Sequence, residues 1–378
     1  MSGKTPSIMV VTGETSGDQR AAEVFVELRR LIGEFEIFGV GGGSLRAAGA
    51  DIITDISETA LFGTSEIISS LLKLKRLRKK LLEEWRRRGA DIAFLVDYGG
   101  FNLRLAKKLK RQGARILYYV SPQVWASRPG RIRWVKRYVD LMLVLFDFEE
   151  ELYRKNGVET IHVGHPLIEK VAADKGREDY LGSLGFDPSA KVVGLMPGSR
   201  DSEIRTLLPP ILEASDRLRS RGYTQQIIVA APGREKEIEQ ELGSRRTTVI
   251  KEDHYSAMAA ADLLIMASGT AALEAAILGV PAVVVYRASL LTSLLARLLM
   301  TVKYVSLPNI ILGEEVYPEL LQSRCNAEAI SAEAALILEN SDRYDRIRRR
   351  LIEVKQALGE PGAAARAAHH VVEFLGKG

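Results

Sequence analysis

The chain of 378 residues has a single cysteine, Cys325, so it cannot form an internal disulfide bond or a zinc cluster held by thiolates. It also lacks a long uninterrupted apolar run, since the longest apolar stretch, from Leu263 to Tyr286, contains Glu274 and Pro281. No positively charged segment followed by an apolar one begins the chain. We therefore expect a cytoplasmic protein that lies on a membrane at most and does not cross it.

Two familiar phosphate-binding motifs are missing as well, because the chain has neither G-x-x-x-x-G-K-[ST] nor G-x-G-x-x-G. What is present is a hydrophobic content of 46%, which is ample for large cores, and a length that suggests two or three domains. The net charge of +5 permits anionic partners such as lipid headgroups, nucleotides or nucleic acid. Charge alone does not choose among them.

Strand and helix patterns alternate along the chain, as a parallel sheet covered by helices requires. Apolar runs predict one series of strands at 7–11, 92–96, 116–120, 141–145 and 161–163, and a second series at 192–196, 227–231, 263–267 and 282–285. We predict an α/β fold of two doubly wound Rossmann-like domains that face each other across a cleft. Their expected bounds are 1–171 and 190–345, followed by a helical tail at 346–378 that packs back on the N-terminal domain or on a partner subunit.

The first predicted strand ends in the turn GETSGD, and a helix follows at once. Ligands of open α/β sheets gather at such turns, but Glu14 and Asp18 would repel a phosphate. Asp97 stands at the carboxyl end of another apolar strand, where a charge is poorly solvated unless it faces a cleft. Its other interpretation is a cap for the helix that begins near Asn102.

Two turns of the second domain run from a strand into a helix and predict phosphate sites. Backbone N–H groups at such a helix start can face a phosphate, to which Arg200 adds charge, while Glu274 is placed for ribose hydroxyls. The candidate residues are Gly198, Ser199, Arg200, Ser268, Gly269, Thr270 and Glu274. A capped helix start with solvated polar side chains is the alternative for both turns.

Six motifs occur in a fixed order between about Val10 and Leu312: GETSGD, YVSPQVWA, VGHPL, PGSRDSEI, ASGTAALE and KYVSLPNIIL. Through this ordered set the chain resembles the lipid-A-disaccharide synthase family, inverting glycosyltransferases of the two-Rossmann-domain (GT-B) type. The resemblance implies transfer of 2,3-diacylglucosamine from its UDP derivative to the 6-hydroxyl of 2,3-diacylglucosamine 1-phosphate. UDP is released and the configuration of the sugar carbon is inverted.

The resemblance also implies roles for individual residues. It places Glu14, Ser16 and Asp18 on the acceptor side of the cleft and the general base at Asp97. The arginine on the donor phosphates is Arg200, and the asparagine of the sixth motif is Asn309. The chain departs from the family pattern at Gly100, where a second aspartate is common, and at Ser127, where a tryptophan is frequent.

The implied chemistry needs a base for the attacking hydroxyl, worth about 10²- to 10⁴-fold, and positive charge for the departing UDP. Asp97 or Glu14 can serve as the base. Arg200, the helix start at 268–270 and Asn309 supply the charge. Because the chain has no D-x-D motif, the cation-holding signature of the other main glycosyltransferase architecture, we expect no metal and no other cofactor.

Acylated substrates require access to a membrane, and the segment SSLLKLKRLRKKLLEEW has the composition of an interfacial helix. We expect its basic residues to face the anionic inner-membrane surface on the cytoplasmic side: Lys73, Lys75, Arg76, Lys79 and Lys80. The alternative is an amphipathic helix packed on its own sheet. A second leucine-rich stretch, at 289–300, is a candidate for holding acyl chains or for filling the core.

Two other functions stay open from the sequence. The nearer is another UDP-sugar enzyme on the same fold, either a different transferase or a UDP-N-acetylglucosamine 2-epimerase. The farther is a non-catalytic protein that binds a membrane surface or nucleic acid through its basic helix. We expect the two sugar substrates and the membrane surface as partners, without nucleic acid, and a homodimer is compatible with the helical tail.

Overall fold

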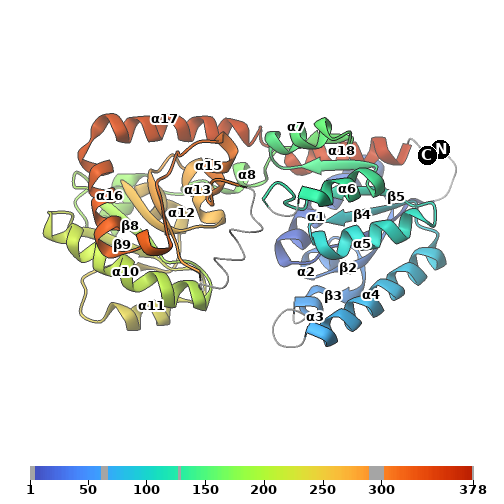
Figure 1. Cartoon of the computed structure of the whole chain (residues 1–378), viewed down its shortest axis with the longest axis horizontal. Helices are drawn as coiled ribbons and strands as arrows, with labels where there is room; N and C mark the ends of the chain where they lie inside the picture. The colour runs from blue at the N-terminus through green and yellow to red at the C-terminus, as the bar shows by residue number, and fades with distance from the viewer. Residues whose placement is uncertain (1–4, 61–66, 127–128, 289–301, 377–378) are drawn as a thin grey trace. The chain divides into compact units, whose positions relative to one another are not determined.

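The computed structural model describes residues 5–60, 67–126, 129–288 and 302–376. The chain forms two compact units: unit 1 contains Met1–Pro166 and Leu358–Gly378, and unit 2 contains Leu167–Ala357 (Figure 1). Ser127 and the leucine-rich stretch at 289–300 lie outside the described residues. The chain therefore leaves unit 1 once and returns to it with its last helix.

Unit 1 is built on a seven-stranded parallel sheet in the order β3-β2-β1-β4-β5-β6-β7. Its strands are β1 (Ser7–Val11), β2 (Glu36–Gly41), β3 (Asp51–Asp55), β4 (Ile92–Val96), β5 (Arg115–Tyr119), β6 (Leu141–Val144) and β7 (Thr160–His162). β1 and β4 are entirely buried, as strands covered by helices on both faces must be. The strand order reverses between β1 and β4, and this switch point is where open α/β sheets bind ligands.

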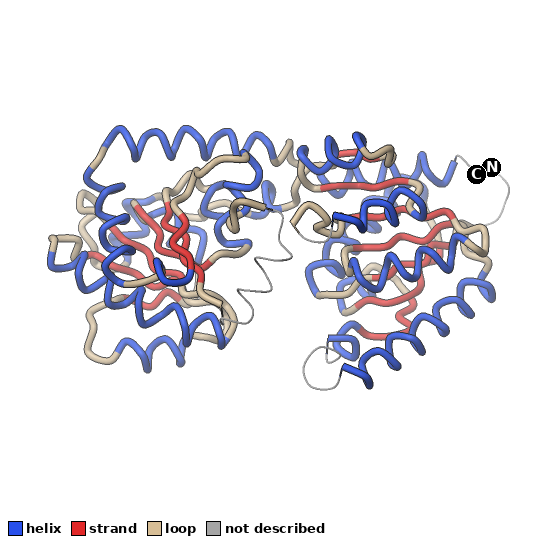
Figure 2. The backbone as a smooth tube through the Cα atoms, viewed as in Figure 1, coloured by secondary structure: helices blue, strands red, loops and turns tan. Residues whose placement is uncertain are grey.

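Helices lie on both faces of this sheet (Figure 2). They are α1 (Thr15–Ile32), α2 (Gly43–Ala47), α3 (Ile56–Ala60), α4 (Ile67–Arg88), α5 (Gly99–Lys110), α6 (Ile132–Tyr138), α7 (Asp147–Lys155) and α18 (Ala363–Gly376), with a 3-10 turn at Pro129–Arg131. Although α18 ends the chain, it packs against α1. The Arg115 guanidinium donates to the Phe374 carbonyl and the His165 N–H to the Leu358 carbonyl, so the last helix is held in unit 1.

Unit 2 repeats the design with a six-stranded parallel sheet in the order β10-β9-β8-β11-β12-β13. Its strands are β8 (Val192–Met196), β9 (Gln225–Val229), β10 (Thr248–Ile250), β11 (Leu263–Ala267), β12 (Ala282–Tyr286) and β13 (Glu319–Leu321). The order reverses between β8 and β11. The predicted α/β fold with two doubly wound units is therefore confirmed.

Unit 2 ends with the helix α17 (Ser341–Ala357), which covers the first part of the tail predicted at 346–378. The helices before it are α8 (Leu167–Lys170), α9 (Arg177–Ser183), α10 (Asp201–Ser220), α11 (Glu235–Leu242), α12 (His254–Ala260), α13 (Thr270–Ile277), α15 (Leu307–Leu312) and α16 (Ala327–Glu339), with a 3-10 turn at Gln322–Arg324. The region expected to form one tail is thus divided between the units. Within the described ranges, no helix has the length and apolar character to cross a bilayer.

Candidate functional site

Unit 1 has a cavity of about 670 Å³ at its switch point. Glu14 enters it from the turn after β1, and Asp97 from the turn after β4. Residues of α4 and α5 complete the wall, and the lining set is Glu14, Leu74, Lys75, Arg78, Asp97, Tyr98, Gly99, Gly100, Phe101 and Arg104. The two candidate bases, 83 positions apart in the sequence, therefore share one cavity.

The backbone at Asp97 is held in an unusual conformation. Asp97 and Tyr98 have φ of 47° and 49°, a left-handed region that costs non-glycine residues energy unless the surroundings hold them there. The Asn102 amide donates to the carbonyls of Val11 at 3.3 Å, of Val96 at 3.2 Å and of Asp97 at 3.0 Å. This single buried amide ties the ends of β1 and β4 together and fixes the turn that carries the aspartate.

The pKa of the Asp97 carboxyl is raised, first by burial and second by the negative charge of Glu14, while Arg20 and the Tyr98 N–H act in the opposite direction. A carboxylate with a raised pKa binds a proton more readily, which is what a general base requires. Glu14 is exposed and begins α1 as its N-cap residue. The pair resembles other carboxylate pairs in which one charge raises the pKa of its neighbour.

Two glycines shape this cavity in different ways. A Cβ on Gly13 would lie 2.4 Å from the Tyr98 ring, so the first turn needs glycine for the ring to pack there. A Cβ on Gly100 would meet nothing within 4 Å. The position where the family commonly has a second aspartate is therefore open space on the cavity wall in this chain.

Asp18 is a correction to the predicted acceptor site. Its side chain is 1% exposed, and its carboxylate accepts the N–H groups of Gly42 at 2.5 Å, Ser44 at 2.9 Å and Leu45 at 3.4 Å. Asp18 thus caps the start of α2 and does not line the cavity. Ser16 is exposed in the first turn of α1, and it is also outside the lining set.

The basic helix α4 (Ile67–Arg88) packs leucines against its own unit and leaves its predicted membrane-facing cations exposed. Leu77 and Leu81 are 6% and 0% exposed within the core of unit 1, and Leu74 and Leu82 pack against that core. Among the side chains of α4 that the structure describes, the leucine stripe therefore faces its own sheet, as the alternative interpretation held. The five predicted membrane-facing cations are exposed, but Lys75 also lines the cavity that contains Asp97.

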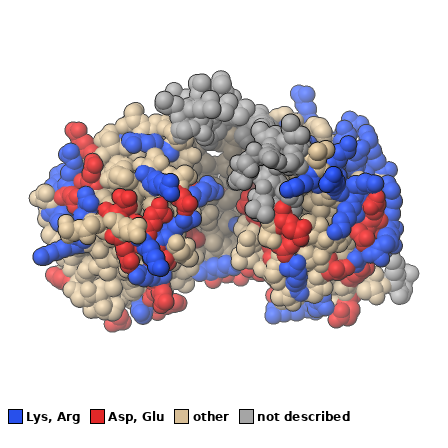
Figure 3. All heavy atoms as spheres, turned by 90° about the horizontal axis from the view of Figure 1, so that it is seen from below, with Lys and Arg blue, Asp and Glu red and all other residues tan. Residues whose placement is uncertain are grey.

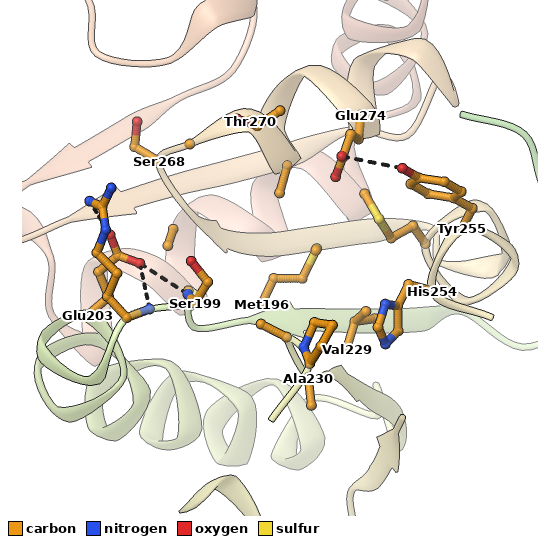
Figure 4. A pocket seen from close by; sticks show the side chains of 18 of the residues that line it. Met196, Ser199, Glu203, Val229, Ala230, His254, Tyr255, Ser268, Thr270 and Glu274 are labelled. Atoms are coloured by element: carbon orange, nitrogen blue, oxygen red, sulfur yellow. Dashed lines mark hydrogen bonds and ion pairs between the residues drawn. The ribbon is translucent and has the colours of Figure 1, made fainter. Parts of the chain in front are cut away.

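Unit 2 has its own cavity of about 670 Å³, at the carboxyl ends of β8 and β11. Figure 4 shows Ser268, Thr270 and Glu274 on one side of it and Ser199, with Met196, on the other. Seven predicted donor residues line it: Gly198, Ser199, Arg200, Ser268, Gly269, Thr270 and Glu274. The walls also include Glu203, His254 and Tyr255, which the motifs did not single out.

Glu203 changes the expected picture of the first turn. Its carboxylate accepts the backbone N–H groups of Ser199 at 3.1 Å and Arg200 at 3.3 Å, and the Arg200 guanidinium lies 3.3 Å from its other oxygen. The N–H groups expected to face a phosphate are thus already bonded. The Arg200 side chain is 80% exposed, so solvent screens its ion pair with Glu203. A glutamate three residues after the N-cap is a recognisable capping signal.

The second turn is open. Gly269 precedes α13 and supplies no capping side chain, and Gly269, Thr270 and Ala271 at this helix start line the cavity. The Ser268 hydroxyl donates to the Val305 carbonyl at 3.0 Å. The Tyr255 hydroxyl donates to Glu274 at 3.4 Å, and burial raises the pKa of the Glu274 carboxyl.

Asn309 is the second correction, because it is 0% exposed and its amide is fully used within the protein. The amide nitrogen donates to the Tyr317 carbonyl at 2.8 Å and to Glu319 at 2.9 Å, and the amide oxygen accepts the N–H groups of Val316 and Tyr317. Asn309 does not line the donor cavity. It supports Glu319, a buried carboxylate that the sequence analysis missed and that also accepts from Ser306.

The whole chain is similar to a known protein family and to curated relatives. Residues 8–372 match the family described as lipid-A-disaccharide synthetase. The chain is 41% identical to a lipid-A-disaccharide synthase of Myxococcus xanthus over 99% of this chain and 98% of the relative. It is 39% identical to the same enzyme of Geobacter sulfurreducens over 98% and 97%.

Solved structures resemble the fold at much lower identity. One is a UDP-GlcNAc 2-epimerase of Neisseria meningitidis bound to UDP-GlcNAc, with a TM-score of 0.64, 12% identity, and coverage of 98% of this chain and 100% of that one. Another is a glycosyltransferase of Rickettsia africae, with a TM-score of 0.57, 12% identity, and coverage of 99% and 98%. At this identity the likeness shows the fold alone.

Proposed function

The chain belongs to the lipid-A-disaccharide synthetase family, and from this membership we infer that it is an inverting glycosyltransferase of lipid A biosynthesis. It transfers 2,3-diacylglucosamine from the UDP derivative to the 6-hydroxyl of 2,3-diacylglucosamine 1-phosphate and releases UDP. The match over residues 8–372 is the observation that carries this function. A UDP-N-acetylglucosamine 2-epimerase is not favoured, because that likeness rests on 12% identity.

For the acceptor, we propose that Asp97 is the general base and that Glu14 keeps the pKa of Asp97 raised. The shared cavity, the fixed turn and the direction of the pKa shift support this assignment. The exposed Glu14 is the alternative base, because it lines the same cavity. Ser16 lies two residues after Glu14, is exposed, and stays a predicted acceptor contact although it is outside the cavity lining.

For the donor, we propose that the UDP diphosphate binds between Arg200 and the start of α13 at 268–270, with the ribose on Glu274. Arg200 is 80% exposed and its ion pair with Glu203 is weak, so an incoming diphosphate can recruit it. The helix start adds N–H donors and the positive end of the helix dipole. This positive charge stabilises departing UDP, so the proposed mechanism needs no metal and no other cofactor.

We also propose that the protein works as a peripheral protein on the cytoplasmic face of the inner membrane. Lys and Arg side chains gather at the right of Figure 3, on the unit that contains α4. The exposed cations of α4 support attraction to anionic lipid. Because Leu77 and Leu81 are buried, the attraction from this part of α4 is electrostatic and is reduced by salt. A homodimer stays a prediction that light scattering tests.

Product analysis tests the function. The purified protein is mixed with UDP-diacylglucosamine and diacylglucosamine 1-phosphate in a neutral detergent, and the products are identified by mass spectrometry. We expect equal amounts of UDP and a disaccharide phosphate, formed only when both substrates are present. Donor that is epimerised in the absence of acceptor would instead identify an epimerase.

A further inference from the structure

The cavity of unit 1 contains groups of both charges. The carboxylates Glu14 and Asp97 come from the turns after β1 and β4, whereas Lys75 and Arg78 come from α4 and Arg104 from α5. Lys75 and Arg78 are three positions apart and therefore lie on one face of their helix. Three cations from two helices thus meet around one cavity that also contains the proposed base.

The side chains of these three cations have no partner among the described residues. Within those ranges, no side-chain hydrogen bond or ion pair involves Lys75, Arg78 or Arg104. Their neighbours on α4 differ, because Lys79 lies 3.7 Å from Glu83 and Lys80 donates to the Ile53 carbonyl at 2.8 Å. Arg78 is also only partly exposed, unlike the other cations of this stretch. Because no ion pair of the described residues occupies these side chains, an anionic ligand can bind them without breaking an existing interaction.

We propose that Lys75, Arg78 and Arg104 form the subsite for the phosphate group of the acceptor sugar. This proposal rests on the proposed function, since it assigns one part of the acceptor. The acceptor carries its phosphate on C1 and its reacting hydroxyl on C6, so one sugar ring needs a cationic contact and a base within one site. The cavity lining supplies both, with carboxylates for the hydroxyl and cations for the phosphate.

The subsite gives orientation as well as affinity. An arginine can hold a phosphate with two parallel N–H bonds, which fixes both the position and the direction of the group. With the phosphate held by residues of α4 and α5, the 6-hydroxyl of the same sugar stays within the cavity that Asp97 also lines. Lys75, Arg78 and Arg104 are therefore positioning residues, and their effect falls on acceptor binding more than on the proton transfer.

The test compares two acceptors in neutral detergent micelles: diacylglucosamine 1-phosphate and the same lipid sugar with a methoxy group in place of the phosphate. The variants are Lys75→Gln, Arg78→Gln and Arg104→Gln. Lys108→Gln is the matched control, because Lys108 is exposed one turn further along α5 and does not line the cavity. Steady-state kinetics give the acceptor KM, the donor KM and kcat for each protein.

We expect Arg78→Gln to raise the KM for the phosphorylated acceptor about 10- to 100-fold, with an unchanged donor KM. Lys75→Gln and Arg104→Gln should each raise the KM for the phosphorylated acceptor about 10-fold. The KM for the methoxy acceptor, already high in the unmodified protein, should be the same in the variants. Lys108→Gln should match the unmodified protein with both acceptors.

A rise of the same size for both acceptors, or no rise for either, overturns the phosphate subsite. Vesicle sedimentation provides a separate arm, because phospholipid headgroups also carry phosphate. Variants that lose binding to anionic vesicles while keeping the KM of the phosphorylated acceptor in micelles would assign the cations to the membrane, against the proposal. If the unmodified protein makes no disaccharide from either acceptor, the proposed function itself fails, which is distinguishable from variants that stay active with an unchanged KM.

Discussion

Glu149→Gln should remove a pH dependence of stability that the structure places in unit 1. Glu149, in the first helical turn of α7, is 3% exposed, and burial raises the pKa of its carboxyl to about 7. Its Oε1 accepts the Ser121 hydroxyl at 2.5 Å and the Trp125 indole N–H at 2.9 Å. A glutamine oxygen can accept the same two bonds, so the substitution changes mainly the charge.

The sign follows from proton binding. The unfolded chain loses the Glu149 proton near pH 4.5, whereas the folded protein keeps it until about pH 7. The contribution of Glu149 to stability therefore falls as the pH rises through this interval and is constant outside it. A difference of about 2.5 pKa units corresponds to about 3 kcal/mol. Glu149→Gln lacks this loss, so its unfolding free energy relative to the unmodified protein should rise by about 3 kcal/mol between pH 4.5 and 8.

Tryptophan fluorescence during urea unfolding measures this difference in unfolding free energy. The signal reports on unit 1, which contains Glu149, because all three tryptophans, Trp85, Trp125 and Trp134, lie in that unit. The control is Glu151→Gln on the same helix, an exposed carboxylate whose pKa is lowered by Lys155. This control should show no gain as the pH rises. A free-energy difference for Glu149→Gln that stays flat between pH 4.5 and 8 would refute the reasoning.

Three further predictions concern activity and membrane binding. Asp97→Asn should lower kcat about 10²-fold or more, while the UDP affinity measured by calorimetry should stay nearly unchanged. Weaker UDP binding with a normal rate would refute the base assignment. Arg200→Ala should weaken donor binding by about 1.5–3 kcal/mol, whereas unchanged affinity removes it from the site. Arg76→Ser with Lys79→Ser should reduce binding to anionic vesicles at low salt by up to about 1 kcal/mol per charge, while turnover in detergent persists; unmodified protein that does not sediment with such vesicles contradicts the membrane role.

The strands that the sequence predicts best are the buried ones. The runs at β1, β4, β8 and β11 are almost wholly apolar, which parallel strands covered on both faces require. β2 is not among the strands predicted from the sequence, because two of its six residues, Gly39 and Gly41, are glycines and interrupt the apolar run. Gly39 has φ of 146°, and a Cβ there would lie 1.9 Å from the Val10 carbonyl oxygen, so the approach of β1 depends on the missing side chain.

The errors at the site share one physical cause. A motif identifies a polar side chain but not the partner that uses it. Asp18 is used by N–H groups more than 20 residues away, and Asn309 by the segment around Tyr317. Both motifs therefore include structural residues, whose role appears only when burial and hydrogen bonds are known.

Lys75 illustrates a different limit. The composition of α4 predicts an amphipathic helix, but it does not say what the leucines and the cations each contact. The structure buries Leu77 and Leu81 and places Lys75 at the Asp97 cavity. A variant that replaces Lys75 together with the other cations would therefore mix membrane binding with acceptor binding, which is why Arg76 and Lys79 are the better pair.

The charges at the two switch points distinguish the substrates that each unit can bind. Both units place two turns at the carboxyl ends of adjacent strands whose order reverses, so the backbone geometry alone does not separate them. In unit 1 these turns carry Glu14 and Asp97, which accept protons and repel phosphate at that point of the cavity. In unit 2 they carry the exposed guanidinium of Arg200 and the helix start of α13, which has no capping side chain, and both can attract phosphate. These charges support the proposal that the hydroxyl that loses a proton binds to unit 1 and that the departing diphosphate binds to unit 2.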